Sequence, residues 1–355
     1  MPLRRLEVTG FRNLVDGHLE PGGGINVIVG DNAAGKTSLL EAIHVLGRAR
    51  SFRVPRLGPV IRRGESLLRV TGIVDAAGTA RHRVGVERRS DTIRVRLDGR
   101  DVRSLSELAR FLPLQVINSE SQRLLQDGPK VRRSFLNWSV FHVEHGYHET
   151  WRRYDRALRQ RNAALRAGLR RQAIAWEAEL VESGLGVDAA RSRLVTDIHN
   201  VLQTLLADWL PGIEVDLSYR HGWSRESGLA EALARMRERD LDLGYTLAGP
   251  HRADLAVRAN GVEAQHWLSR GQQKGLVIAV LLAQVRQMAT VSTRQPILLI
   301  DDLAAELDMA GREAVMQEVV SSGAQVFVTA IDAATVPVTR SQARWYHVEH
   351  GRVRE

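Results

Sequence analysis

The feature that most constrains this chain is a glycine-rich stretch between two apolar segments. Residues 25–29 form a short β-branched apolar run, and residues 38–46 carry the apolar spacing of a helix. Between them, Gly30 is followed by four residues and then by Gly35-Lys36-Thr37. The order of strand, glycine-rich loop and helix is that of a phosphate-binding loop, and it predicts an α/β fold around the loop.

Each part of this loop has a chemical role. The glycines let the backbone turn peptide N–H groups toward a phosphate, Lys36 reaches the β- and γ-oxygens, and the Thr37 hydroxyl can ligate Mg²⁺. The alternative, a glycine-rich turn with a chance lysine, is disfavoured by the strand before it and the helix after it. We therefore expect ATP and Mg²⁺ as cofactors. The residues expected to bind the nucleotide are Gly30, Asp31, Asn32, Ala33, Ala34, Gly35, Lys36, Thr37 and Ser38.

A second apolar run, residues 297–300, ends in Asp301-Asp302. We expect Asp301 to hold the metal together with Thr37, and Asp302 to orient or deprotonate an attacking water. Taken alone, an apolar run that ends in acids is as often an ordinary buried strand end as a catalytic one. The pairing with the loop at Lys36 favours the catalytic interpretation.

A third motif, Ser269-Arg270-Gly271-Gln272, precedes a buried helix predicted over 276–288. A serine hydroxyl, free N–H groups and the helix dipole together suit an anion. An ordinary helix start would explain the motif if it stood alone. Its position shortly before Asp301 favours a nucleotide contact.

The charge of the chain suggests a polyanionic partner. Lys+Arg is 50 against 41 Asp+Glu, a formal net charge of +9. For any single arginine a solvated helix face is the better explanation, but the basic residues taken together favour DNA. No base-reading motif is apparent. We therefore expect DNA affinity to depend on DNA structure and salt concentration, and not on base sequence. The basic residues concerned are Lys130, Arg132, Arg133, Arg152, Arg153, Arg156, Arg159, Arg161, Arg166, Arg170 and Arg171, with a second cluster at Arg48, Arg50, Arg53, Arg56, Arg62 and Arg63.

Composition narrows the setting further. The chain has no cysteine, which excludes disulfides and thiolate metal sites and fits a reducing cytoplasm. No uninterrupted apolar run approaches the roughly 20 residues of a membrane span, and the first residues show no export signal. We therefore expect a cytoplasmic protein with no membrane partner.

The pattern along the chain predicts an α/β unit that is interrupted and then resumed. Residues 3–8, 297–300 and 326–329 are strand-like, and residues 67–98 form an antiparallel meander with turns at Ala77-Gly78 and Asp98-Gly99. Helical periodicity dominates residues 124–240, and strand-like sequence returns near Leu241. We place the α/β domain at 1–117 and 241–355, and a mainly helical lobe that contacts DNA and the dimer partner at 118–240.

The motifs together resemble an ABC-type P-loop ATPase head, in order and spacing. Further segments are similar to the RecF family of bacterial recombination mediators, and this resemblance covers essentially the whole chain. These segments are FRNL at 11–14, DGPKVRRSFLNW at 127–138, GPHRADL at 249–255, LSRGQQK at 268–274 and LLIDDLAAELD at 298–308.

The resemblance implies a cytoplasmic, ATP-dependent homodimer that binds DNA gaps or single-strand–double-strand junctions. It further implies that such a dimer acts with RecO and RecR to load RecA. Ser269, Gly271 and Gln272 would contact the γ-phosphate bound to the partner subunit's Lys36, and Asp308 would lie at the dimer seam. Other residues expected from the family pattern are Arg12 and Asn13 at the nucleotide, and Gln115 on the metal side.

Three departures from the ABC pattern matter. Ala33 stands where many such loops have glycine, so we expect no positive φ there. Asp302 replaces the usual glutamate and is one methylene shorter. Thr329 and Ala330 occupy the place of the usual switch histidine. We expect slow, DNA-dependent hydrolysis, with ATP acting mainly as a dimer clamp.

Three rival interpretations remain. An ATPase subunit of a membrane transporter is disfavoured by the long helical insertion, by Arg270 within the signature and by the basic lobe. An SMC or Rad50-type protein needs coiled-coil arms far longer than residues 118–240. A DNA-binding scaffold without ATPase function is disfavoured because Lys36, Thr37 and Asp301 are all present.

Overall fold

The computed structural model describes residues 2–75, 80–291 and 296–355. The chain divides into two compact units: the first unit comprises residues 1–121 and 288–355, and the second unit comprises residues 122–287. The sequence places the later boundary near residue 241. In the structure residues 241–287 pack with the second unit instead, because β10 (Asp254–Ala259) pairs with β9 (Val215–Arg220).

The first unit contains a largely parallel six-stranded sheet with the order β15-β14-β3-β13-β12-β8. All pairings are parallel except that of β14 with β15. Every residue of β12 and β13 is buried, as expected for central strands of a parallel sheet covered on both faces. The strand bounds are Ile25–Val29 for β3, Leu114–Ile117 for β8, Ile297–Ile300 for β12, Gln325–Ala330 for β13, Ala343–Glu349 for β14 and Arg352–Arg354 for β15.

The predicted meander is the antiparallel second sheet of this unit, with the order β2-β1-β4-β5-β6-β7. The turn at Asp98-Gly99 is confirmed, with φ of 51° and 79° that suit a tight hairpin. The expected turn at Ala77-Gly78 lies outside the described residues. The strands are Leu3–Thr9 (β1), Gly17–Leu19 (β2), Leu67–Asp75 (β4), Arg81–Arg89 (β5), Ile93–Leu97 (β6) and Arg100–Asp101 (β7).

Helix α1 (Lys36–Arg48) joins the two sheets through one hydrophobic core. Ten of its 13 residues are buried, and its apolar side chains cluster with the inward faces of both sheets. Because α1 begins at Lys36, packing of this helix fixes the position of the loop before it. The remaining elements of the unit are η1 (Gly58–Val60), α2 (Leu105–Phe111), η2 (Ser119–Gln122), α11 (Leu303–Glu306), α12 (Met309–Ser322) and η4 (Ala333–Thr335).

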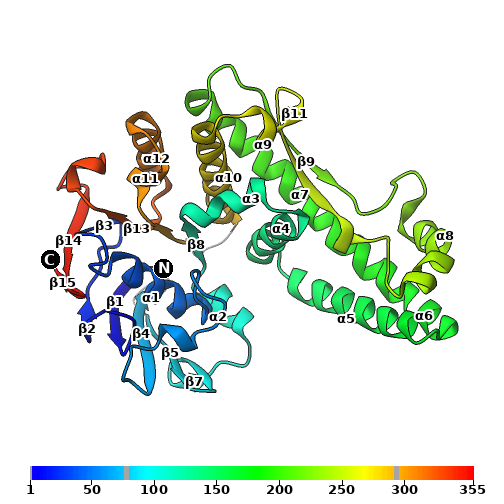
Figure 1. Cartoon of the computed structure of the whole chain (residues 1–355), viewed down its shortest axis with the longest axis horizontal. Helices are drawn as coiled ribbons and strands as arrows, with labels where there is room; N and C mark the ends of the chain where they lie inside the picture. Colours follow the sequence, from blue (N-terminus) through cyan, green and yellow to red (C-terminus); the bar gives the residue numbers. More distant parts are fainter. Residues whose placement is uncertain (1, 76–79, 292–295) are drawn as a thin grey trace. The chain divides into compact units, whose positions relative to one another are not determined.

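The second unit is mainly helical, as predicted, and α5 packs along the 33-residue α7 (Figure 1). The prediction missed β9, which lies within the supposedly helical stretch and forms a three-stranded sheet, β11-β10-β9. Its partner β10 is far along the chain, and the helical periodicity of the residues around β9 dominated the prediction for this segment. The bounds are Arg123–Gln126 (α3), Pro129–Val143 (α4), Tyr147–Arg166 (α5), Arg170–Ala175 (α6), Glu177–Trp209 (α7), Gly228–Leu243 (α8), Pro250–Arg252 (η3), Val262–Glu263 (β11) and Ala264–Trp267 (α9).

Helix α10 (Arg270–Val291) starts six residues before the predicted 276–288 and ends in the first unit. It is long and apolar enough to cross a membrane by length and composition alone, but 61% of its most apolar window is buried within the protein. A helix that is apolar on most sides and packed in the interior is a core helix.

Candidate nucleotide site

The carboxyl ends of the parallel strands bring the predicted loop and the predicted acids together. Gly30 follows β3 and Asp301 follows β12, and both strands pair with β13. Gly30 has φ of 153°, and a Cβ there would lie 2.2 Å from the Val348 carbonyl oxygen, so only glycine fits. The loop is thus fixed by the neighbouring strand β14 as well as by α1.

The expectation for Ala33 is wrong, because this residue has φ of 62°, in the left-handed region. An alanine pays a steric penalty there that a glycine would not. Asn13 stabilises the conformation: its Nδ2 donates to the Ala33 carbonyl at 2.9 Å, and its Oδ1 accepts from the Ser38 hydroxyl at 2.8 Å. Asn13 therefore holds the loop through side-chain contacts that keep the backbone turned.

The Lys36 ammonium lies inside the loop and is 8% exposed. It donates to the carbonyl oxygens of Gly30 and Asp31 at 2.7 and 2.9 Å. An ammonium has three donors, so one N–H remains for an oxygen of a phosphate. The lysine is therefore held by its own loop with one donor left for a ligand.

Three side chains meet where the sequence predicts the metal ion. The hydroxyls of Thr37 and Thr329 both donate to Asp301 Oδ1, at 3.0 and 2.8 Å. Burial raises the pKa of the Asp301 carboxyl, and the neighbouring Asp302 charge acts in the same direction. Octahedral Mg²⁺ with bonds of 2.0–2.1 Å places adjacent ligand oxygens about 2.9 Å apart, so the Thr37–Asp301 separation fits this ion.

Asp302 lies beside this group with a left-handed backbone, φ 54°. Its amide donates to the Thr329 hydroxyl at 2.8 Å, so Thr329 contacts both acids. The sequence identified Thr329 only as the place where a histidine is missing. In the structure it orients Asp301 and fixes the turn that carries Asp302.

Arg12 is held at the site by a buried carboxylate. Glu41 of α1 is fully buried and accepts from Nε and Nη2 of Arg12, both at 2.9 Å. Ser51 donates to the same carboxylate, and Arg53 lies 3.5 Å from it. Glu41 was not predicted as part of the site, because a glutamate inside a helix carries no distinctive sequence signal.

These residues surround a cavity of about 650 Å³ in the first unit. Its size and its mixture of cations, hydroxyls and two carboxylates suit a nucleoside triphosphate with a divalent ion. Nowhere in the described part of the chain do three or more histidine or acidic residues gather to hold a metal by themselves. The lining residues are Arg12, Asn13, Asn32, Ala33, Gly35, Lys36, Thr37, Ser38, Arg53, Pro59, Ile61, Arg62, Arg63, Asp301, Asp302 and Thr329.

Gln115 is not brought to this cavity. It pairs in register with Leu298, three residues before Asp301, and its Nε2 donates to the Val116 carbonyl at 2.9 Å. Three residues of strand span about 10 Å, which is too far for a shared metal. Asn118 is the residue of this strand end that lies level with Asp301, since Ile117 pairs with Ile300.

The signature motif lies in the second unit and forms a capping box at the start of α10. The Ser269 hydroxyl accepts from the Gln272 amide at 3.3 Å, and Gln272 Oε1 accepts from the Ser269 amide at 2.9 Å. The serine O–H and the glutamine NH₂ both remain available as donors. Ser269 and Gly271 are exposed, so the motif can reach a ligand outside its own chain.

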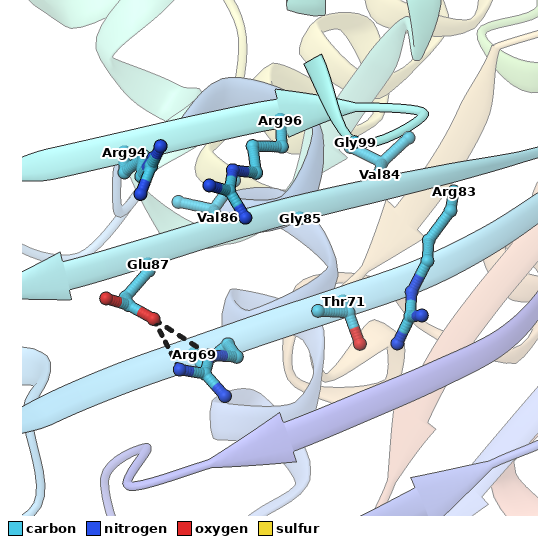
Figure 2. A pocket seen from close by; sticks show the side chains of 10 residues that line it. All are labelled: Arg69, Thr71, Arg83, Val84, Gly85, Val86, Glu87, Arg94, Arg96 and Gly99. Carbon is cyan, nitrogen blue, oxygen red and sulfur yellow. Dashed lines mark hydrogen bonds and ion pairs between the residues drawn. The ribbon is translucent and has the colours of Figure 1, made fainter. Parts of the chain in front are cut away.

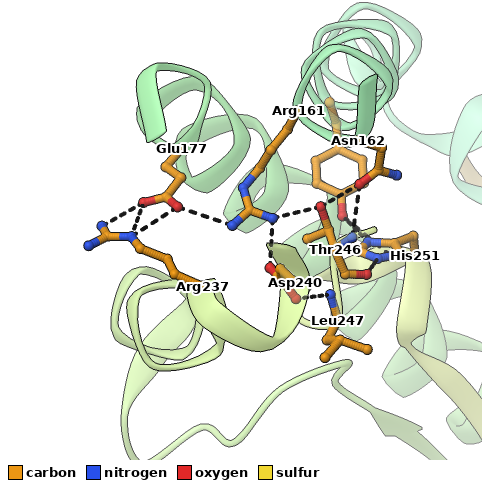
Figure 3. Close-up of polar contacts among 9 residues, drawn as sticks. Arg161, Asn162, Glu177, Arg237, Asp240, Thr246, Leu247 and His251 are labelled. Carbon is orange, nitrogen blue, oxygen red and sulfur yellow. Dashed lines mark hydrogen bonds and ion pairs between the residues drawn. The ribbon is translucent and has the colours of Figure 1, made fainter. Parts of the chain in front are cut away.

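Several arginines predicted to contact DNA are instead structural. Arg161 is 1% exposed and bonds Asp240 at 2.7 Å, Thr246 at 2.8 Å and Glu177 at 3.1 Å (Figure 3). Arg132 forms two bonds with Asp254, at 2.7 and 2.9 Å. The prediction failed for these residues because sequence alone does not distinguish a buried arginine from an exposed one. Other members of the cluster, Arg152, Arg156, Arg166 and Arg171, are exposed.

His251 of the GPHRADL segment braces the second unit. Its Nε2 lies 2.8 Å from the Thr246 carbonyl oxygen, and its Nδ1 lies 2.6 Å from the Tyr154 hydroxyl. Since a carbonyl only accepts, Nε2 carries the proton and Nδ1 accepts from Tyr154. Burial lowers the pKa of His251 to about 4.

The loop, the paired acids and the interrupted α/β fold define a nucleotide-binding head of the ABC and SMC class. The family model described as RecF/RecN/SMC N terminal domain matches residues 2–354. Relatives named RecF, 40–43% identical over 99% of this chain, show that the chain belongs to the RecF family.

Similar proteins agree with this assignment. The protein called "DNA replication and repair protein RecF" from Stutzerimonas stutzeri (strain A1501) is 43% identical, over 99% of this chain and 97% of its own length. Its counterpart from Shewanella amazonensis is 40% identical over 99% of both chains. A solved structure of the recombination mediator protein RecF with ATP has a TM-score of 0.89 at 23% identity, covering 99% of this chain and 98% of its own. An SMC head domain from Pyrococcus furiosus has a TM-score of 0.61 at 16% identity, covering 99% and 95%.

Proposed function

We propose that this protein is an ATP-dependent DNA-binding protein of recombinational repair and replication in the cytoplasm. The observation that carries the proposal is that Lys36, Thr37, Asp301 and Asp302 all line the same cavity. ATP binds there, and Thr37 and Asp301 hold the Mg²⁺ that neutralises phosphate charge. Relatives at 40–43% identity are named for DNA replication and repair, which supports DNA as the macromolecular ligand.

In this proposal ATP is bound at the interface between two copies of the chain and holds them together. Ser269, Gly271 and Gln272 donate to the γ-phosphate held by the partner subunit's Lys36, which makes the interface two-fold. The free donors and exposure of the capping box support this role. Asp308 lies at the seam between the two copies.

The closed dimer holds DNA gaps or single-strand–double-strand junctions through phosphate contacts. It acts with RecR and RecO in loading RecA, as proposed from the solved relative assigned to the RecFOR pathway. Hydrolysis is weak, because Asp302 has a shorter reach than glutamate toward an attacking water. It also depends on DNA.

Light scattering after gel filtration tests the proposal, with and without ATP and gapped DNA. The wild-type chain and Asp302→Asn should form dimers with ATP and bind gapped DNA more tightly as dimers. Lys36→Arg should stay monomeric. Oligomers that form equally without ATP, helicase-like turnover, or a membrane protein as the stable partner would overturn it.

A further inference from the structure

The outer face of the antiparallel sheet in the first unit carries an arginine cluster that the nucleotide site does not use. Side chains alternate along each strand, so Val70, Val84 and Val95 enter the core. The residues between them point outward on three neighbouring strands. Those with guanidinium groups here are Arg69 on β4, Arg83 on β5, and Arg94 and Arg96 on β6 (Figure 2).

A hollow of about 380 Å³ lies among these arginines. Gly85 forms its floor, since it stands in register between Thr71 on one side and Arg96 on the other and has no side chain. A Cβ at Gly85 would meet only the Thr71 methyl, at 3.4 Å, so the backbone conformation does not require glycine. The effect of Gly85 is to leave space between the guanidinium groups.

The charges around the hollow do not cancel. Its lining contains four arginines and one acid, Glu87, and the partner acids Asp101 and Glu7 reduce the excess to one positive charge. Arg69 bonds Glu87 at 2.6 and 2.9 Å, while Arg94 and Arg96 share Asp101 at 2.9 and 3.2 Å. Arg83 lies 4.0 Å from the Glu7 carboxylate.

These ion pairs leave the arginines free to change partners. The four side chains are 48–72% exposed, and ion pairs at exposed positions contribute little to stability. A phosphate can therefore replace a carboxylate at small cost, and a guanidinium binds a phosphate with two parallel hydrogen bonds.

We propose that this face contacts the sugar–phosphate backbone of DNA, with phosphates seated over Gly85 between Arg83 and Arg96. The inference rests on the proposed function, which supplies DNA as the ligand. The hollow is open and arginines extend along the strands on both sides of it, which suits a chain of phosphates. Alternate residues of a strand are about 7 Å apart, similar to the spacing of neighbouring phosphates along one DNA strand.

The test measures fluorescence anisotropy of labelled gapped duplex with ATP present, over a range of salt concentrations. Arg83→Ser with Arg96→Ser should weaken binding and reduce the slope of log K against log salt by about 1.8, the value for two lost duplex phosphate contacts. Gly85→Val should weaken binding with every charge kept. Arg340→Ser with Arg354→Ser removes the same charge from exposed positions elsewhere in the unit and should retain the sheet-face contacts.

The possible outcomes distinguish a failure of this inference from a failure of the proposed function on which it rests. If the wild-type chain fails to bind DNA, the proposed function fails. If the wild-type chain binds while the sheet variants keep both its affinity and its slope, this inference alone is overturned. This inference is also overturned if the sheet variants bind DNA normally and lose only the binding of pyrophosphate or of an acidic protein. ATP-dependent dimerisation of each variant serves as the check on folding.

Discussion

The Thr37 hydroxyl donates to Asp301 Oδ1 across 3.0 Å, although 264 residues separate them in the sequence. Thr37 is the second residue of α1, and Asp301 directly follows β12, which lies two places from β3 in the sheet. Their contact joins the two halves of the nucleotide site before any ligand contact is considered. Thr329 completes the arrangement by donating to the same oxygen.

Thr329→Val should weaken Mg²⁺ binding while leaving the metal ligands in place. The valine matches the threonine in shape, but Asp301 loses an orienting donor and the Asp302 amide loses its acceptor. Loss of such an orienting partner costs about 10–100-fold in metal affinity. Titration of Mg²⁺ at fixed ATP, read by a fluorescent nucleotide, measures the shift. Thr335→Val is the control, and an unchanged Mg²⁺ midpoint for Thr329→Val would contradict the assignment.

Ala33→Gly should stabilise the first unit by up to about 1 kcal/mol. The left-handed backbone at Ala33 penalises a Cβ, and this gain exceeds the entropy that glycine adds to the unfolded chain. Ala34→Gly is the matched control, because Ala34 lacks a positive φ and its substitution should destabilise. Urea unfolding of both variants gives the comparison. Equal destabilisation by the two substitutions would show that the turn at Ala33 is not strained.

The sequence predicted the parts of the site that depend on local order. A strand, a glycine-rich loop and a helix are adjacent in the chain, so Lys36 and Thr37 could be assigned directly. Asp301 was found because an apolar run ending in acids gains meaning once a phosphate-binding loop is present in the same chain. Thr329 and Glu41 were missed because their roles arise only from neighbours that folding brings close.

The errors have the same origin. Gln115 was expected from the family pattern, but strand register decides which residue reaches the sheet edge. Ala33 was judged by residue type, whereas contacts from Asn13 fix its backbone. Strand β9 was missed because its partner β10 lies beyond an intervening helix.

Ser269→Asp should abolish the ATP-dependent dimer without unfolding α10. Aspartate is as good a helix cap as serine, so the helix start survives, but its charge repels a γ-phosphate. Ser269→Asn keeps the cap without the charge and should dimerise more readily. Light scattering with ATP compares the two variants. A dimer of Ser269→Asp as stable as that of the wild-type chain would exclude the signature from the interface.

Arg161→Met should destabilise the second unit by about 3–5 kcal/mol. Removing Arg161 leaves Asp240 as a buried carboxylate without its ion-pair partner. Arg159→Met on the same helix is the control, since Arg159 is exposed and pairs with Asp155 only one turn away. We expect a change within about 0.5 kcal/mol for the control. Similar values for the two variants in urea unfolding would mean that Arg161 is not structural.

The stability of the second unit should fall as the pH falls from about 6.5 to 4. The folded-state pKa of His251 is lowered to about 4 against 6.5 for a free histidine, so the unfolded chain takes up this proton first. Stability from the neutral imidazole is present above pH 6.5 and is lost toward pH 4. A separation of 2.5 pKa units corresponds to about 3 kcal/mol.

Urea unfolding at pH 7, 6, 5 and 4 measures this loss. Six of the seven tryptophans lie in the second unit, so tryptophan fluorescence reports mainly on that unit. His251→Asn should be less stable than the wild-type chain at pH 7, because Tyr154 and Thr246 lose their partner. The variant should also lose about 3 kcal/mol less than the wild-type chain between pH 7 and pH 4. Parallel pH profiles of the two proteins would show that His251 does not remain neutral in the folded state.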